Sequence, residues 1–265
     1  MPVQADTAKR GAIIEGREMP FDGFPAKTYH PAKFPDAVLD TLVLMLQERW
    51  GDGGNQTILD PFAGTGRIHT LQDHGWKTWG VEIEHEWADP QPNTICGDST
   101  TDLRTILRPH VDPRVLGEGF HAIVTSPPWA NGMGQRSPHT NDKGQSTRFS
   151  YADGLGRRLC ENNTGALRWG PRYRELVDLV WRQCADLLAP GGLMVVDNRD
   201  STRTGTIQPV TAWHITTLHG YGLKLAGIGA VAAQGVGQGS QKTAVGNAQL
   251  LVSFTKPDNW TLPGE

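Results

Sequence analysis

The chain has 265 residues, 37% of them hydrophobic, and carries 25 basic against 28 acidic side chains for a net charge of −3. This composition suits a globular protein with a full core, built as one large α/β domain or two smaller ones. No apolar run approaches the roughly 20 residues of a membrane span, residues 1–20 lack the apolar core of a signal peptide, and the scattered Cys96, Cys160 and Cys184 predict a reducing, cytoplasmic location without disulfides or zinc.

Residues 1–29 show no clear period and predict an irregular N-terminal arm. Residues 34–51 carry apolar side chains at helical spacing and predict a helix that stops at Gly51. Two later amphipathic segments, 173–192 and 209–222, predict further helices. Seven short apolar runs predict strands at 57–60, 78–84, 93–98, 120–126, 192–198, 224–231 and 249–254.

Strands that alternate with helix-length segments are typical of a parallel sheet covered on both faces. The last two runs are joined by a Gly/Gln-rich loop, residues 232–247, which predicts an antiparallel hairpin at the sheet edge. We therefore predict an α/β fold: a seven-stranded, mostly parallel sheet with a terminal antiparallel hairpin and helices on both faces. A single domain is expected over 30–257, followed by a tail at 258–265.

The connection over residues 131–172 is too long for a routine loop in a compact domain. Residues 131–174 contain eight basic and three acidic side chains, a net +5, which leaves −8 for the rest of the chain. A basic segment on an acidic body is typical of a polyanion contact, although charge alone fits a solvated surface loop equally well. We interpret 131–172 as a basic substrate-binding insertion and expect Arg157 and Arg158 to contact phosphates.

The stretch ILDPFAGTGR, residues 58–67, places a strand end at Asp60 and two glycines shortly after it. Gly64 and Gly66 let the backbone turn tightly before a helix and let a ligand approach the main chain. The stretch lacks the third glycine of a dinucleotide fingerprint and the Gly-Lys-Ser/Thr of a phosphate-binding loop. These absences disfavour NAD and ATP as ligands.

Acidic residues occupy the next two predicted strand ends. Glu82 suits the hydroxyls of a ribose, with Glu84 as a competitor for that role, and Asp98 suits an adenine amino group. Carboxylates would repel a phosphate, so the pattern favours an adenosine-bearing ligand that has none. S-adenosylmethionine meets this description.

Residues 124–130, VTSPPWA, lead from an apolar run straight into Ser126-Pro127-Pro128-Trp129. Two prolines cannot continue a strand ladder, because they lack an N–H and fix φ near −65°. The strand therefore ends in a rigid corner that carries a hydroxyl group and an indole. Taken alone, this corner fits a strand-ending turn with a core aromatic, and Trp169, Trp181 and Trp213 are most simply packing residues.

With these motifs the chain resembles the DNA amino-methyltransferases, which methylate the exocyclic nitrogen of cytosine or adenine. DPFAGTG (60–66) matches the family's cofactor loop, SPPW (126–129) its catalytic tetrapeptide, and HPAKFP (30–35) the motif beside the cofactor's methionine end. The three motifs occur in the family's order over roughly residues 28–255, and the compact form is similar to solitary or phage-borne methyltransferases. The resemblance implies DNA methylation of the restriction-modification kind, and the existence of a cognate restriction enzyme stays open. Arg67 departs from the pattern, where a small residue is more usual; it either touches substrate or caps the surface.

The resemblance implies the Rossmann-like fold of a class I methyltransferase that uses S-adenosylmethionine, releases S-adenosylhomocysteine and needs no metal. The cofactor-binding residues that it implies are His30, Pro31, Asp60, Phe62, Ala63, Gly64, Gly66, Glu82 and Asp98. The catalytic residues that it implies are Ser126, Pro127, Pro128 and Trp129. The Ser126 hydroxyl oxygen and the Pro127 carbonyl would accept the two N–H bonds of the target amino group, and Trp129 would stack on a flipped-out base.

Serine at the first tetrapeptide position is commoner in the family's cytosine enzymes, so the expected reaction is N4 methylation of cytosine in DNA. The alternatives are an N6-adenine DNA methyltransferase, an RNA amino-methyltransferase, and a methyltransferase-fold binding module without turnover. No separate target-recognition domain is visible in the sequence. Recognition is then expected from 131–172 and from the 232–247 loop with Lys242. Oligomeric state and target sequence stay open.

Overall fold

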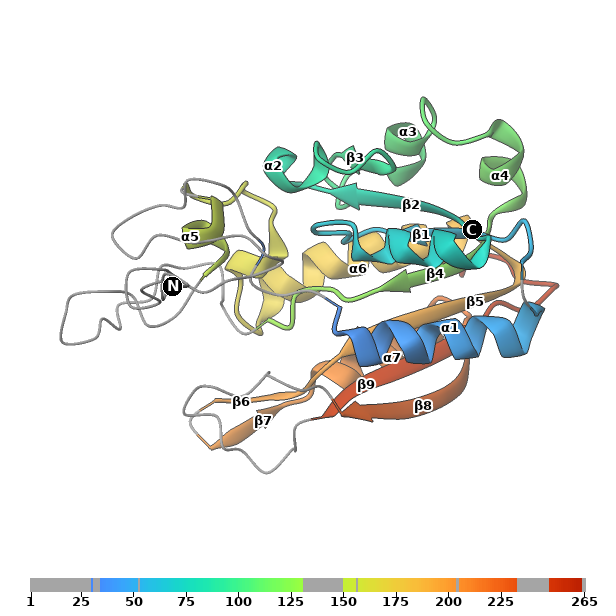
Figure 1. Ribbon diagram of the computed structural model, residues 1–265. Helices are drawn as coiled ribbons and strands as arrows, with labels where there is room; N and C mark the ends of the chain where they lie inside the picture. Colours follow the sequence, from blue (N-terminus) through green and yellow to red (C-terminus); the bar gives the residue numbers. More distant parts are fainter. Residues whose placement is uncertain are drawn as a thin grey trace, which may run out of the picture.

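A computed structural model describes residues 30, 34–51, 53–130, 150–155, 157–203, 205–232 and 248–263 (Figure 1). The predicted arm, Pro31, residues 131–149 of the basic insertion, and Lys242 lie outside these residues. The centre of the molecule is a seven-stranded sheet with the strand order β3-β2-β1-β4-β5-β9-β8. Its strands are β1 (Thr57–Asp60), β2 (Lys77–Glu82), β3 (Thr94–Cys96), β4 (Phe120–Thr125), β5 (Leu188–Asn198), β8 (Lys224–Ala232) and β9 (Ala248–Thr255).

Strands β3, β2, β1, β4 and β5 run parallel, whereas β9 is antiparallel to both β5 and β8. All seven predicted strands are present, and the last two form the predicted hairpin with β8 at the sheet edge. The predicted fold class, a Rossmann-like mostly parallel sheet of the class I methyltransferase type, is therefore confirmed. The antiparallel direction of β9, which lies between β5 and β8, distinguishes this sheet from a fully parallel one.

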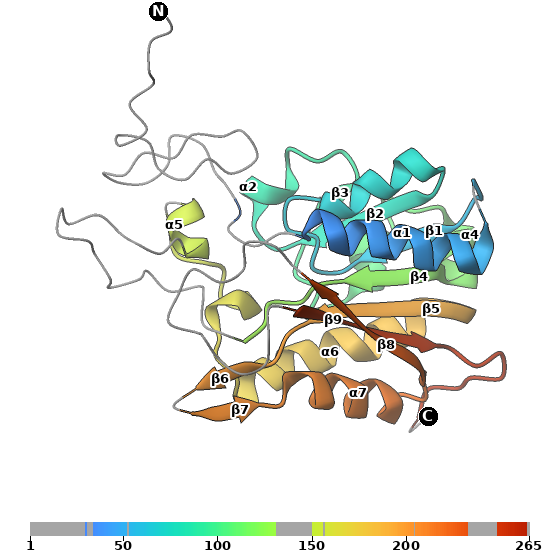
Figure 2. The same ribbon diagram turned by 60° about the horizontal axis from the view of Figure 1, so that its bottom comes forward.

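The main helices cover the two faces of the sheet. Figure 2 shows α1 (Asp36–Trp50) on one face, with α6 (Pro171–Leu187) and α7 (Val210–Gly220) on the other. Within β4, Ala122 and Val124 pack in the cluster under α1, while Ile123 packs in the cluster under α6. This two-residue alternation is that of a strand buried on both faces.

Shorter elements fill the connections. They are α2 (His85–Ala88), α3 (Leu103–Leu107), α4 (Pro113–Glu118), α5 (Tyr151–Leu155), the 3₁₀ helices η2 (Arg67–His74) and η3 (Thr164–Ala166), and a ribbon of β6 (Ser201–Arg203) with β7 (Thr206–Gln208). Of these elements the sequence predicted only η2, the helix after Gly66. Among the described helices, none has the length and apolar character to cross a bilayer.

The helix predicted after Gly66 is a 3₁₀ helix and not an α-helix. Its two buried side chains, Ile68 and Leu71, are three residues apart. A 3₁₀ helix has three residues per turn, so this spacing puts both side chains on the sheet-facing side.

The chain's strand order reverses between β1 and β4. From β1 the chain builds outward to β2 and β3, and it returns to place β4 and β5 on the other side of β1. In parallel sheets the crevice outside the carboxyl ends at such a switch point is where ligands bind. The turn after Asp60 and the corner after Thr125 lie at these two adjacent strand ends.

Candidate functional site

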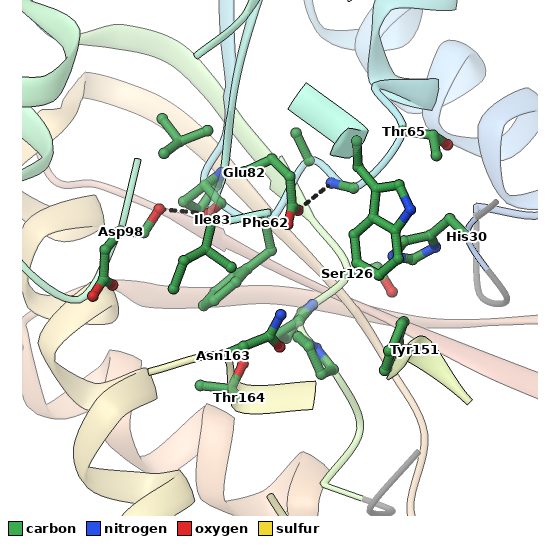
Figure 3. Close-up of a pocket in the computed structure, with 18 of the residues that line it drawn as sticks. His30, Phe62, Thr65, Glu82, Ile83, Asp98, Ser126, Tyr151, Asn163 and Thr164 are labelled. Carbon is green, nitrogen blue, oxygen red and sulfur yellow. Dashed lines mark hydrogen bonds between the residues drawn. The ribbon is translucent and has the colours of Figure 1, made fainter. Parts of the chain in front are cut away.

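A pocket of about 260 Å³ lies at the carboxyl edge of the parallel strands, slightly below the roughly 300–1,000 Å³ that is typical of ligand pockets. Figure 3 shows Asp98 toward one end, His30 and Tyr151 toward the other, and Glu82 between them. Ten residues predicted from the sequence line this pocket: His30, Phe62, Ala63, Gly64, Glu82, Asp98, Ser126, Pro127, Pro128 and Trp129. The structure thus brings the predicted cofactor loop and the predicted catalytic corner to one cavity.

Asp60 lies beneath the pocket and does not line it. Its side chain is fully buried, and its Oδ1 accepts hydrogen bonds from the Phe62 amide at 2.9 Å and from the Thr125 hydroxyl at 2.6 Å. Burial raises the pKa of Asp60 to about 7, while the hydrogen bonds from Thr125 and Phe62 act in the opposite direction. Asp60 therefore ties the turn after β1 to the last residue of β4.

The two glycines of the loop have different surroundings. Gly64 has φ +54°, and a Cβ there would lie 3.2 Å from Nε2 of His30 inside the pocket. Gly66 has φ +72°, and a Cβ there would lie 2.7 Å from His69 and 3.1 Å from Thr94. Both positions need the left-handed conformation that glycine adopts without a Cβ penalty. Only Gly64 lines the pocket; Gly66 lets the loop pack closely on η2 and β3.

Glu82 and Glu84 were competing candidates for the ribose contact, and of these two only Glu82 lines the pocket. Glu82 lines the pocket, where its carboxylate accepts hydrogen bonds from the amides of Gly64 and Glu84, each at 2.9 Å. Burial raises the pKa of Glu82 to about 7 against the effect of those two amides. The Glu82 side chain thus links the end of β2 to the cofactor-loop turn.

Glu84 is fully buried and anchors a segment from much later in the chain. Its Oε1 accepts hydrogen bonds from the Cys160 amide and the Asn163 side chain, both at 2.8 Å, and its Oε2 pairs with Arg157 at 2.7 Å. Arg157 also forms a two-bond pair with Glu86. The Arg157 guanidinium is thus paired with two carboxylates and is not the free cation that the sequence suggested, while its expected phosphate contact stays a prediction.

The segment held by Glu84 supplies a wall of the pocket. Asn162, Asn163 and Thr164 line the cavity. The side-chain amide of Asn162 donates a hydrogen bond of 2.8 Å to Asp98 Oδ2. Asp98 also accepts from the Thr100 amide and hydroxyl. No sequence motif marks this wall, since its residues lie within the long connection over 131–172. The pair of asparagines at 162 and 163, at the end of that stretch, was the only available signal.

Three rings close the end of the pocket near Gly64. The His30 ring centroid lies 4.3 Å from that of Trp87 and 5.1 Å from that of Tyr151, and all three residues line the cavity. Tyr151 begins α5 and Trp87 lies on α2. The sequence predicted His30 here through its motif, but it gave no signal for the two other rings.

Arg67 lines the pocket at its edge and forms an ion pair with Asp36 in the first turn of α1. Two other lining residues keep a buried polar atom without a hydrogen-bond partner among the described residues: the Thr65 hydroxyl and the Gln249 amide oxygen. Buried polar groups are normally paired, so these two atoms fit a cavity that receives a polar ligand. Gln249 reaches it because β9 runs antiparallel, which brings the start of β9 to the carboxyl edge of β5.

Ser126 follows β4 directly, and Asp197 near the end of β5 lies behind it. Asp197 is 1% exposed, and the Ser126 hydroxyl is a hydrogen-bonding group that faces its carboxylate. Burial raises the pKa of Asp197 to about 7, and the Ser126 hydroxyl lowers it. A titratable acid thus lies directly beneath the predicted catalytic corner.

The raised pKa of Asp197 predicts a stability that depends on pH. The folded protein resists ionisation of this group, so its stabilising effect is present below the unfolded pKa of 3.8 and is lost as pH rises through about 7. Asp197→Asn removes the ionisation and is expected to be more stable than wild type at about pH 8, by an amount that shrinks by up to about 1.4 kcal/mol per pH unit toward acid pH. Denaturant unfolding of Asp197→Asn and of wild type, at about pH 8 and at acid pH, measures this difference in stability.

The exposed Asp73 provides the control. Asp73→Asn should leave the free energy of unfolding nearly unchanged at both pH values. A stability difference between Asp197→Asn and wild type that does not vary with pH would contradict the assignment.

Within the described residues, no group of three or more His, Cys, Asp or Glu is arranged to hold a metal ion.

The three tryptophans interpreted as packing residues do pack: Trp181 is fully buried in the core under α6, and Trp169 and Trp213 lie partly buried against that core. None of the three lines the pocket.

No protein-family model and no curated protein matches the chain. Solved structures resemble it at low identity. A TehB-like SAM-dependent methyltransferase from Corynebacterium glutamicum is 16% identical with a TM-score of 0.44, over 81% of this chain and 86% of that one. TrmN from Thermus thermophilus is 14% identical with a TM-score of 0.44, over 83% and 48%. The N-methyltransferase NodS from Bradyrhizobium japonicum is 13% identical with a TM-score of 0.43, over 84% and 96%. At these values the likenesses say nothing about the reaction.

Proposed function

We propose that this protein transfers a methyl group from S-adenosylmethionine to the exocyclic N4 nitrogen of cytosine in DNA. The observation that carries the proposal is the meeting of the Gly64 turn and the Ser126–Trp129 corner in one pocket at the sheet's switch point. The sequence motifs at these two places resemble the cofactor loop and catalytic tetrapeptide of DNA amino-methyltransferases. Their convergence is what a transfer between two bound molecules needs.

The pocket residues fit the proposed cofactor. Glu82 offers carboxylate oxygens to ribose hydroxyls, and Asp98 offers them to an adenine amino group. S-adenosylmethionine carries no phosphate that these two carboxylates would repel. Gly64 leaves the space that a Cβ would fill next to His30, and the Thr65 hydroxyl and Gln249 amide offer unsatisfied polar atoms. S-adenosylmethionine, when bound, supplies an electrophilic methyl group on a sulfonium.

The protein's own residues would activate a weak nucleophile, the amino nitrogen of cytosine. The lone pair of a cytosine amino group is delocalised into its ring, so the nitrogen must move toward a tetrahedral shape before it can attack. Acceptors at the Ser126 hydroxyl oxygen and the Pro127 carbonyl would favour that shape, and the two prolines hold them in place without reorganisation. Asp197 behind Ser126 favours a hydroxyl proton that points inward, which leaves the oxygen's lone pairs toward the substrate.

Trp129 would hold the target base outside the DNA stack. It is partly exposed at the pocket, directly after the two prolines. Stacking of a base on an aromatic side chain contributes roughly 1–3 kcal/mol. A flipped base of either kind can stack in this way, so Trp129 contributes affinity and the acceptor pair contributes the chemistry.

DNA would be held by exposed cations near the corner. Arg158 and Arg168 are exposed and flank the segment that walls the pocket. Arg158→Ala with Arg168→Ala is expected to weaken DNA binding and to lower the magnitude of the log–log salt slope by about 0.9 per lost phosphate contact. The affinity for S-adenosylmethionine should stay unchanged. Fluorescence anisotropy with labelled DNA over a salt series measures the slope.

Arg108 and Arg114 give a control with the same change in net charge. Both are exposed and lie around α3 and α4. Their double alanine variant should keep the wild-type salt slope. Equal slopes in all three proteins would mean that DNA is bound elsewhere.

The proposed reaction is tested with tritiated S-adenosylmethionine and unmethylated DNA, followed by mass spectrometry of the hydrolysed nucleosides. The expected product is N4-methylcytosine. N6-methyladenine would establish the adenine enzyme, and label transferred only to RNA would establish an RNA amino-methyltransferase. Binding of S-adenosylmethionine without transfer to any nucleic acid would establish the binding module and overturn the proposal.

A further inference from the structure

The Ser126–Trp129 corner is held in place by hydrogen bonds from outside it. Pro127 and Pro128 have no amide N–H, so two successive backbone donors are missing where β4 ends. The ladder between β4 and β5 stops at the pair Thr125–Val196, one residue before the corner. Beyond that point the backbone depends on groups from other parts of the chain.

Two such groups reach the corner from the entry to α6. The Tyr173 hydroxyl donates a hydrogen bond of 2.7 Å to the Pro128 carbonyl, and the Trp169 amide donates one of 2.8 Å to the Ala130 carbonyl. Ala130 has φ +53°, a left-handed conformation that a residue with a Cβ rarely adopts. Such a backbone persists only where its surroundings hold it, and such sites cluster around functional residues.

The Tyr173 bond fixes the rotation that the proline rings leave free. The ring of Pro128 sets its φ, but its ψ stays free to turn. A hydroxyl that holds the Pro128 carbonyl sets this ψ, and with it both the direction of Trp129 and the tilt of the Pro127 carbonyl relative to it. These are the two groups that the proposed function assigns to base stacking and amino-group acceptance.

Tyr173 acts without touching the pocket. It is fully buried at the start of α6, packs against the rings of Trp169 and Trp213, and is not a lining residue. Its hydroxyl would be costly to bury without an acceptor, and the acceptor it has is the corner itself. We infer that Tyr173 is a positioning residue for the Ser126–Trp129 corner; the inference rests on the proposed function.

The test uses Tyr173→Phe, which removes only the hydroxyl, and Tyr221→Phe as its matched control. The Tyr221 hydroxyl donates to Asp178 at 2.9 Å, away from the pocket. Tyr173→Phe is expected to lower kcat roughly 10-fold to 100-fold at saturating substrates, with the Kd for S-adenosylmethionine within about twofold of wild type. Tyr221→Phe should change neither. Wild-type kcat in Tyr173→Phe would overturn the inference.

A double-mutant cycle separates positioning from a general loss of structure. If Tyr173 acts by directing Trp129, then combining Tyr173→Phe with Trp129→Ala should lower kcat/KM by less than the product of the two single effects. Effects that multiply fully would mean that Tyr173 acts independently of Trp129, and would overturn the inference.

A third readout does not need enzymatic activity. In protein labelled with fluorotryptophan, the Trp129 resonance is assigned through Trp129→Phe. Tyr173→Phe should shift or broaden this resonance and Tyr221→Phe should not. If wild type transfers no methyl group yet Trp129 responds to Tyr173→Phe, the positioning role stands and the proposed function falls. If wild type transfers the methyl group but Tyr173→Phe leaves the Trp129 resonance unchanged, the positioning role alone is overturned.

Discussion

Ser126→Ala is expected to lower kcat by on the order of 10²–10³-fold, the cost of one lost group that stabilises a transition state. The hydroxyl oxygen is an acceptor whose bond strengthens as the target nitrogen becomes tetrahedral, so its loss raises the barrier more than it weakens binding. Ser126 shares its pocket with the cofactor loop but lies at the end of a different strand. The Kd for S-adenosylmethionine should therefore stay near the wild-type value.

Single-turnover kinetics with preformed enzyme–DNA complex measure this effect, and isothermal titration calorimetry measures cofactor affinity. Ser253→Ala is the control: its hydroxyl donates to the Gly227 carbonyl at 3.2 Å within the β8–β9 hairpin, and it is nearly buried. This control loses a hydroxyl of the same kind and should keep kcat. A Ser126→Ala variant with full single-turnover rate would remove Ser126 from the mechanism.

Gly64→Val is expected to weaken S-adenosylmethionine binding by at least on the order of 10²-fold, which corresponds to about 2.7 kcal/mol. A Cβ at this position would lie 3.2 Å from His30 Nε2, and the two further methyl groups would project into the pocket. The substitution also strains the backbone, because φ is +54°. Calorimetric titration of the folded variant with the cofactor gives the comparison.

Gly53→Val separates strain from blockage. Gly53 has φ +68°, so valine is strained there too, but a Cβ at Gly53 meets nothing within 4 Å. Both variants should lose thermal stability, and only Gly64→Val should lose cofactor affinity. Equal cofactor affinity in the two variants would show that the turn after β1 does not face the ligand.

Local signals were sufficient wherever one short segment determines its own structure. The glycines at 64 and 66 predicted a tight turn because left-handed backbone favours glycine, and both have positive φ. The two prolines predicted the end of β4 because they cannot donate to a ladder. The alternation of strands with helix-length segments predicted the sheet, since a parallel pair requires a long crossover between its strands.

Contacts between distant segments were beyond the reach of these signals. Arg157 looked like a free cation by charge and position, but it is paired with Glu84 and Glu86, about 70 residues earlier in the chain. The sequence favoured Glu82 over Glu84 for the pocket, but it carried no signal for what Glu84 contacts. β2 ends at Glu82, so the chain turns and sends Glu84 away from the pocket toward Cys160 and Asn163.

The sequence by itself thus determined the sheet, the turn after Asp60 and the corner at Ser126, because each depends on backbone preferences of neighbouring residues. Only the tertiary structure decided that Glu84 binds Cys160, Asn163 and Arg157, that Gln249 enters the pocket from an antiparallel strand, and that Tyr173 holds the Pro128 carbonyl. The physical reason is that a hydrogen bond or ion pair between distant residues depends on where two elements dock. Docking is set by the packing of the whole core and leaves no periodic trace in either segment.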